Sequence, residues 1–197
     1  MRRTAAAILA ATCAFATLSC ASGDPDPVVV VGADSSAESI LLAEIYSQAL
    51  DRTGTDSTVV TGLTTPLADL DAARIAVFPT RNGTLLDRWN PASQARTPAD
   101  VATAVNASLP QGLSITDPAD GTDLRPLDAL PDPDYTLRAQ NILALYRTGI
   151  FDRRQLKKLN YVAGELTTED LRESIAQIES GTPPADAARS WLDAHGL

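Results

Sequence analysis

Polar and charged side chains follow an apolar run near the start of the chain, and their types suit ligand binding. Residues 28–31 read VVVV, Gly32 comes next, and Ser35, Ser36 and Glu38 follow within six positions. A β-branched run of this kind is typical of a strand buried on both faces. Serine hydroxyls and the free N–H groups of a following helix are suited to polar or anionic ligand groups. The alternative is an ordinary strand–helix unit without a ligand.

A second polar stretch, PTRNGT at residues 79–84, follows the apolar run RIAVF at residues 74–78. In a parallel sheet this loop lies at the same carboxyl edge as Ser35 and Ser36. Small ligands tend to bind in the crevice at that edge. The two stretches therefore predict one candidate binding site.

Strand and helix signals alternate through the first part of the chain, which explains how these residues come together. The first helix stops near Gly54, residues 57–61 read as a strand, and Pro66 suits the first turn of a second helix. Residues 74–78 are the third strand. This β-α-β-α-β order predicts an α/β fold with a mostly parallel sheet.

The later part of the chain predicts further elements and two ambiguous stretches. Thr97 caps a helix, and residues 112–116 are a fourth strand candidate. Residues 117–134 are rich in proline and aspartate and read as a linker. Residues 142–146 (ILALY) suit either a buried strand or a short helix. Three capped helices then follow to the end of the chain.

Composition limits the possible functions. The chain has 197 residues and a formal net charge of −9, which suits one well-buried domain and argues against a nucleic-acid partner. Its one histidine, His195, lies third from the end, and no nucleophile elbow or phosphate loop occurs. The aspartates near Gly121 lack the ligand order and closing glutamate of a calcium loop. We therefore expect no enzyme, metal or cofactor.

The N-terminus resembles a bacterial lipoprotein signal. Two arginines precede the apolar residues 4–18, and residues 17–21 (TLSCA) resemble a lipobox. Residues 1–19 are then the signal peptide, Cys20 is the acylated residue, and residues 20–27 are a flexible tether. The expected location is extracytoplasmic, with the lipid as the attachment to the cell membrane. A plain secretory signal with an incidental cysteine is the alternative.

Several separated blocks resemble one family. They are GADSSAESILLAEIY at residues 32–46, FPTRNGTLL at 78–86, LPQGL at 109–113, GELTTEDL at 164–171 and ARSWLDAHGL at 188–197. They are similar to the osmoprotectant substrate-binding proteins of ABC importers, which bind glycine betaine, choline or carnitine and have the type 2 periplasmic-binding-protein fold. The second block resembles that family's tyrosine-proline-glutamate-tyrosine-threonine-glycine-threonine motif.

The resemblance implies a shortened form of this fold. Residues 28–197 would form a single lobe with C-terminal helices, and residues 117–134 would replace most of the second lobe. Residues 140–146 would be a strand that returns to the first lobe's sheet, which favours the strand over the helix there.

The resemblance also implies a changed pocket. The family's cage tyrosine falls on Arg81, its motif glutamate on Thr80, and a phenylalanine on Ser36. Aromatic cages hold quaternary ammonium groups, whereas an arginine favours a carboxylate, sulfate or phosphate. The expected pocket residues are Ser35, Ser36, Glu38, Phe78, Thr80, Arg81, Asn82 and Gln140.

The function implied by the resemblance is the substrate-binding component of an ABC importer for osmoprotectant-like solutes. Its expected partners are a small solute and an ABC permease. The alternative is a non-transporting envelope lipoprotein that keeps the fold and binds a protein partner.

Overall fold

The computed structural model describes residues 28–122 and 137–197, which include a five-stranded sheet in the order β2-β1-β3-β5-β4. The strands are β1 (Val29–Gly32), β2 (Ser57–Val60), β3 (Val77–Arg81), β4 (Leu113–Ile115) and β5 (Ile142–Arg147). β1 pairs in parallel with β2 and β3, while β5 is antiparallel to both β3 and β4. The α/β architecture with a mostly parallel sheet is therefore confirmed, and the ambiguous stretch before Arg147 is a strand.

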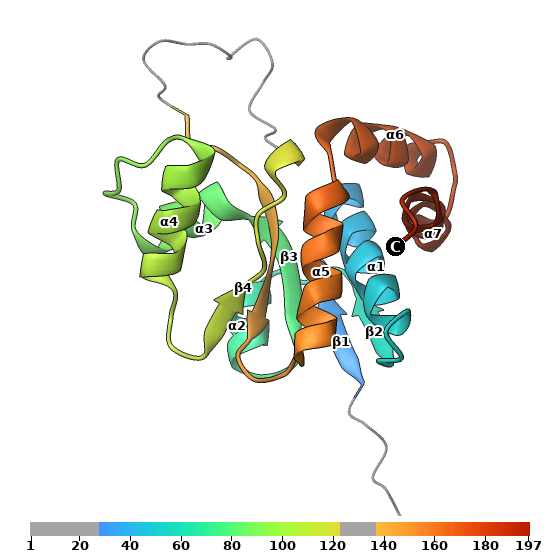
Figure 1. Cartoon of the computed structure of the whole chain (residues 1–197), viewed down its shortest axis with the longest axis horizontal. Helices are drawn as coiled ribbons and strands as arrows, with labels where there is room; N and C mark the ends of the chain where they lie inside the picture. Colours follow the sequence, from blue (N-terminus) through green and yellow to red (C-terminus); the bar gives the residue numbers. More distant parts are fainter. Residues whose placement is uncertain (1–27, 123–136) are drawn as a thin grey trace, which may run out of the picture.

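Helices cover both faces of the sheet and make a three-layer arrangement (Figure 1). On one face lie α1 (Ala37–Asp51), α5 (Arg153–Glu165), α6 (Thr168–Glu179) and α7 (Pro184–Ala194). On the other face lie α2 (Pro66–Asp71), α3 (Asn82–Trp89) and α4 (Pro98–Ser108). Among the described residues, no helix is both long and apolar enough to cross a membrane.

The strand β5 separates two hydrophobic cores because its side chains alternate between the faces. Ile142, Ala144 and Tyr146 pack in the core with α1, α5, α6 and α7. Leu143 and Leu145 pack in the core with α2, α3 and α4. A strand buried on both faces reads as a continuous apolar run, which explains why its sequence alone left helix and strand open.

The capping signals at the starts of α4, α5 and α6 hold in the structure, whereas α7, the last helix expected to be capped, has no side-chain cap hydrogen bond. The Thr97 side chain accepts a hydrogen bond from the Asp100 backbone N–H at the start of α4. Thr167 and Asp170 form a reciprocal capping box at the start of α6. These contacts satisfy backbone groups at the first turn, so the helices begin where the sequence predicted.

The third strand differs from its prediction. It was expected at residues 74–78, with a loop after it, but β3 runs over Val77–Arg81 and passes directly into α3. Pro79 can lie inside β3 because this position forms no backbone hydrogen bond with β5. Its partner there, Ala144, forms its backbone hydrogen bonds with Thr116, the residue after β4, so the backbone nitrogen of Pro79 points toward β1. The β1 ladder reaches β3 only at Val77, and therefore no partner requires an N–H at Pro79.

The first six residues of the predicted linker, residues 117–122, form part of the folded structure. Ala119 and Thr122 are fully buried, and a short 3₁₀ helix, η1 (Asp120–Thr122), follows a bridge between Ala119 and Ile142. Ala119 and Thr122 thus pack against β5, and the Asp117 backbone N–H donates to Asn160 Oδ1 of α5 at 3.1 Å. The rest of the linker prediction, residues 123–134, lies outside the described residues, as do the signal peptide, Cys20 and the tether.

Candidate functional site

A hollow of about 190 Å³ lies at the carboxyl edge of β1 and β3, where the sequence predicted a site. Five of the eight expected pocket residues line it: Ser36, Glu38, Phe78, Thr80 and Arg81. The structure adds Asp34, Ser39, Leu42, Pro79 and Thr84. The two polar stretches, separated by about forty residues in the chain, therefore meet at one edge of the sheet.

The turn between β1 and α1 is held by short side-chain contacts. Ser36 is the N-cap of α1, and its hydroxyl accepts a hydrogen bond from the Ser39 backbone N–H at 3.2 Å. The carboxylate of Asp34 accepts one from the Ser36 backbone N–H at 2.7 Å. Asp34 was missed in the sequence, although an aspartate two positions before an N-cap serine is typical of an Asx turn. The Ser36 hydroxyl is therefore occupied by the cap.

An ion pair across the hollow is its main electrostatic feature. Arg81 Nη2 lies 2.6 Å from both carboxylate oxygens of Glu38, and Nη1 donates to the Gln140 carbonyl at 2.9 Å. Both side chains are mostly buried, with exposed fractions of 19% for Arg81 and 29% for Glu38. Arg81 is therefore already paired with a carboxylate of the protein, and an anionic ligand group in the hollow would share its guanidinium with Glu38.

Three expected residues do not line the hollow. Ser35 is exposed beside it. Asn82, the first residue of α3, is fully buried, and neither atom of its amide has a hydrogen-bond partner among the described residues. Gln140 contributes its backbone carbonyl to Arg81, and its side-chain oxygen accepts from Thr84 at 3.4 Å. Gln140 thus accepts hydrogen bonds from two residues that line the hollow, Arg81 and Thr84, and Asn82 lies in the interior.

The charges that face the hollow favour a polar ligand with a positive group. Asp34 and Glu38 supply two carboxylates against the single guanidinium of Arg81. The Phe78 ring is only 7% exposed, so it offers little surface for an aromatic cage. The arrangement can bind a small charged group through carboxylates and hydrogen bonds. Across the described residues, no group of three or more potential metal-ligating side chains occurs.

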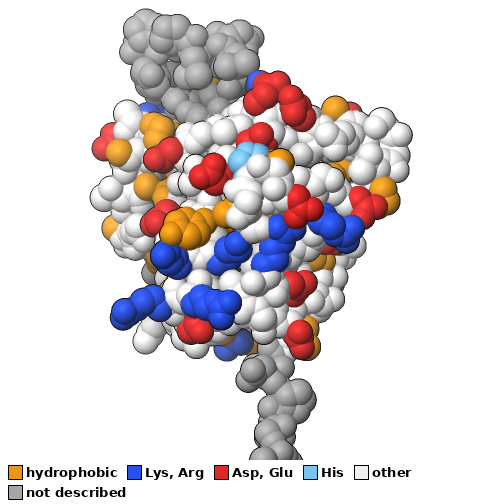
Figure 2. Space-filling model, turned by 45° about the vertical axis from the view of Figure 1, so that its right-hand side comes forward, with side chains coloured by type: hydrophobic (Ala, Val, Ile, Leu, Met, Phe, Trp, Pro, Cys, Tyr) orange, Lys and Arg blue, Asp and Glu red, His pale blue; other side chains and the backbone are white. Residues whose placement is uncertain are grey.

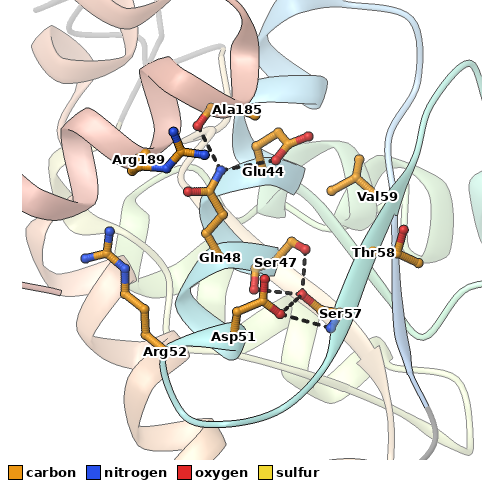
Figure 3. A pocket seen from close by; sticks show the side chains of 10 residues that line it. All are labelled: Glu44, Ser47, Gln48, Asp51, Arg52, Ser57, Thr58, Val59, Ala185 and Arg189. Atoms are coloured by element: carbon orange, nitrogen blue, oxygen red, sulfur yellow. Dashed lines mark hydrogen bonds between the residues drawn. The ribbon is translucent and has the colours of Figure 1, made fainter.

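A second hollow of about 440 Å³ lies between α1, β2 and α7, and the sequence did not predict it (Figure 3). Its polar groups bond to one another: the Ser57 hydroxyl donates to Asp51, and the Gln48 amide donates to Glu44 and to the Ala185 carbonyl. These contacts join α1 to β2 and α7. The hydrogen bonds assign this hollow a structural role.

Comparisons with known proteins bear on the fold. No protein-family model and no curated protein matches the chain. Among solved structures, apo YehZ from Escherichia coli is similar with 14% identity and a TM-score of 0.73, covering 86% of this chain and 99% of that one. A structure described as a glycine betaine/carnitine/choline ABC transporter is similar with 13% identity and a TM-score of 0.72, covering 85% of this chain and 98% of that one.

These identities are low, so the similarity concerns the fold. It agrees with the fold that the resemblance of the sequence blocks implied. The chain has the α/β fold shared by YehZ and the glycine betaine/carnitine/choline transporter structure.

Proposed function

We propose that this chain is the extracytoplasmic substrate-binding component of an ABC importer for small osmoprotectant-like solutes of the glycine betaine and choline class. The observation that carries the proposal is the hollow at the carboxyl edge, lined from two separate sequence blocks, in a fold shared with a glycine betaine/carnitine/choline transporter structure. Acylation at Cys20 and docking to an ABC permease are parts of the same proposal.

The charges of the hollow support a zwitterionic solute. Glu38 and Arg81 present opposite charges side by side, and Asp34 adds a second carboxylate. A solute with an ammonium group and a carboxylate matches such a pair, because each end meets a group of opposite charge. The ammonium end is held here by carboxylates, in place of the aromatic faces that hold it in a cage.

A thermal-shift screen tests the proposal. The protein is the mature chain, residues 20–197, with Cys20→Ser to prevent acylation, and it retains every residue that the structure describes. The panel holds glycine betaine, choline, carnitine, proline, sulfate and a dicarboxylate. A solute at about a hundred times its dissociation constant adds roughly 2.7 kcal/mol to the free energy of unfolding, which gives a readable shift in Tm.

Two matched variants locate the binding. Glu38→Gln should abolish the shift with betaine or choline, because it removes a carboxylate from the hollow and leaves Arg81 without its partner. Glu44→Gln is the control, since Glu44 lies on the same helix and lines the other hollow. The Tm shift that each solute causes in Glu44→Gln should equal the shift in the unmodified chain.

Two outcomes would contradict the proposal. A shift with sulfate or the dicarboxylate only, lost in Arg81→Met, would indicate an anion site. No shift with any solute would favour the alternative, a lipoprotein that binds a protein partner and transports nothing.

A further inference from the structure

A cluster of basic side chains occupies the first two turns of α5. The sequence RRQLKK at residues 153–158 holds four cations within six positions, including both lysines of the chain. Arg153, Arg154 and Lys157 are exposed and Lys158 is half-buried. Within residues 28–122 and 137–197, none of the four forms an ion pair. Such a cluster is unusual in a chain with a net charge of −9.

The cluster continues onto the end of α1 and surrounds a hollow of about 230 Å³. Lys157, Lys158 and Arg154 line the hollow with Tyr161 and with Arg52, whose guanidinium also pairs with Asp193 at 2.5 Å. Burial, with the neighbouring charge of Arg52, lowers the pKa of Lys158. Lys157 Nζ lies 5.3 Å from the centre of the Tyr161 ring, which is 51% exposed. Figure 2 shows Lys and Arg side chains gathered across the middle and lower part of this face, with acidic side chains around and between them.

Helix stability does not account for these cations. Positive side chains in a first helical turn oppose the helix dipole, and α5 has no acidic residue in that turn. Arg154 and Lys158 are four positions apart on one helix, a spacing at which like charges repel. Asp152 and Gln155 already satisfy the first backbone groups of α5 through a capping box. The four cations therefore destabilise the first turns of α5. Such a local cost is expected where charged side chains bind an anionic partner.

The cluster lies beside the point where the chain enters the domain. Gln155 Nε2 donates to Thr55 Oγ1 at 2.7 Å, and the Val29 backbone N–H donates to the Asp56 carbonyl at 2.9 Å. Val29 is the first residue of β1. The start of α5 and the start of β1 are at the same end of the molecule (Figure 1).

We propose that this basic surface, Arg52, Arg154, Lys157, Lys158 and Tyr161, lies against the anionic lipid headgroups of the membrane. The orientation rests on the proposed anchor: eight residues, 20–27, would join Cys20 to β1, and they span at most about 29 Å when fully extended. Side-chain cations near an anionic bilayer are attracted within a Debye length, about 10 Å at moderate salt. The surface would hold the domain with its solute hollow, at the opposite edge of the sheet, facing away from the lipid.

Vesicle sedimentation tests the surface without using the lipid anchor or a solute. The Cys20→Ser mature chain is mixed with vesicles of phosphatidylcholine, either pure or with about one third phosphatidylglycerol, at about 0.02 M salt. We expect binding to the anionic vesicles only, and its loss at about 0.3 M salt. Arg154→Glu with Lys157→Glu should weaken binding at least about tenfold.

A second double variant provides the matched control. Arg88→Glu with Arg172→Glu changes the net charge by the same amount at exposed positions on α3 and α6. It should leave vesicle binding within about twofold of the unmodified chain.

Equal losses in both double variants would overturn the proposal, because net charge alone would then explain the binding. Absence of binding to anionic vesicles at low salt would also overturn it. Loss of solute uptake in cells that carry the α5 variant, without vesicle binding, would instead assign the surface to a protein partner. The solute screen is independent of these outcomes, since its hollow is formed by α1 and β3 at the other edge.

Discussion

Arg81 at the end of β3 and Glu38 in the first turn of α1 face each other across the carboxyl edge, with Nη2 2.6 Å from both carboxylate oxygens. The guanidinium that the sequence placed in the candidate site as a charge partner is thus paired with a carboxylate of the protein itself. The pair links the two sequence blocks that line the candidate site, and it joins the first turn of α1 to the end of β3.

A double-mutant cycle should measure this link. Arg81→Met, Glu38→Gln and the double variant are compared in urea unfolding, and we expect a coupling free energy of about 1 kcal/mol, since both side chains are mostly buried. The control cycle uses Arg172 and Glu169, which are 3.7 Å apart and largely exposed. Its coupling should be close to zero. Equal couplings in the two cycles would contradict a special role for the pair at the edge.

Gly83→Ala should destabilise the protein although alanine is the better helix former. An added Cβ at Gly83 would lie 2.5 Å from the Ala139 carbonyl oxygen and would also meet the Gln140 side chain. We expect a loss of about 1–3 kcal/mol in the free energy of unfolding. Gly164→Ala in α5 is the control, because nothing lies within 4 Å of its added Cβ. That variant should be more stable by up to about 1 kcal/mol, and a similar gain at Gly83 would refute the close approach.

Thr122→Val should lower the free energy of unfolding, because the Thr122 side chain accepts a hydrogen bond from the backbone of β5. The Ile142 N–H donates to Thr122 Oγ1 at 2.8 Å, and Thr122 is fully buried. Valine keeps the shape but leaves this N–H without an acceptor, which costs about 1–3 kcal/mol in chemical denaturation. Thr103→Val, at an exposed position of α4, should change stability by less than about 0.5 kcal/mol. Equal effects would show that the Thr122 hydroxyl does not support β5.

The alkaline limit of stability should depend on Tyr46. Burial raises the pKa of the Tyr46 phenol in the folded state, while the unfolded phenol releases its proton near pH 10. Above that pH the unfolded state binds fewer protons than the folded state, so stability falls by about 1.4 kcal/mol per pH unit for this group. Below pH 10 the group has no such effect.

Urea unfolding at several alkaline pH values measures this slope. Tyr46→Phe should flatten the decline, whereas Tyr161→Phe should not, because Tyr161 is 51% exposed. Identical slopes for the two variants would count against the buried phenol as the cause.

Helix starts were predictable because caps are local. Thr97 with Asp100, and Thr167 with Asp170, make their contacts within three residues, so the sequence contains both partners side by side. The strand–turn–helix at the opening was predictable for the same reason, since Ser36 caps α1 from the adjacent position. The position of the candidate site at the carboxyl edge followed from the order of these elements.

The third strand shows where local signals failed. Pro79 and the polar residues after it are typical of a loop, but their antiparallel pairing with β5 extends β3 to Arg81. β5 lies between β3 and β4 in the sheet. It is more than sixty residues away from β3 in the sequence, so no local signal could reveal the pairing.

The sequence by itself determined the alternating elements, the caps of α4, α5 and α6 and the two polar stretches that line the candidate site. Only the tertiary structure decided that Glu38 pairs with Arg81, that Asn82 lies in the interior and that Ala119 and Thr122 pack against β5. The physical reason is the range of the contacts. A cap satisfies backbone groups within one turn, whereas an ion pair between residues 43 positions apart exists only after the strand order has brought their elements together.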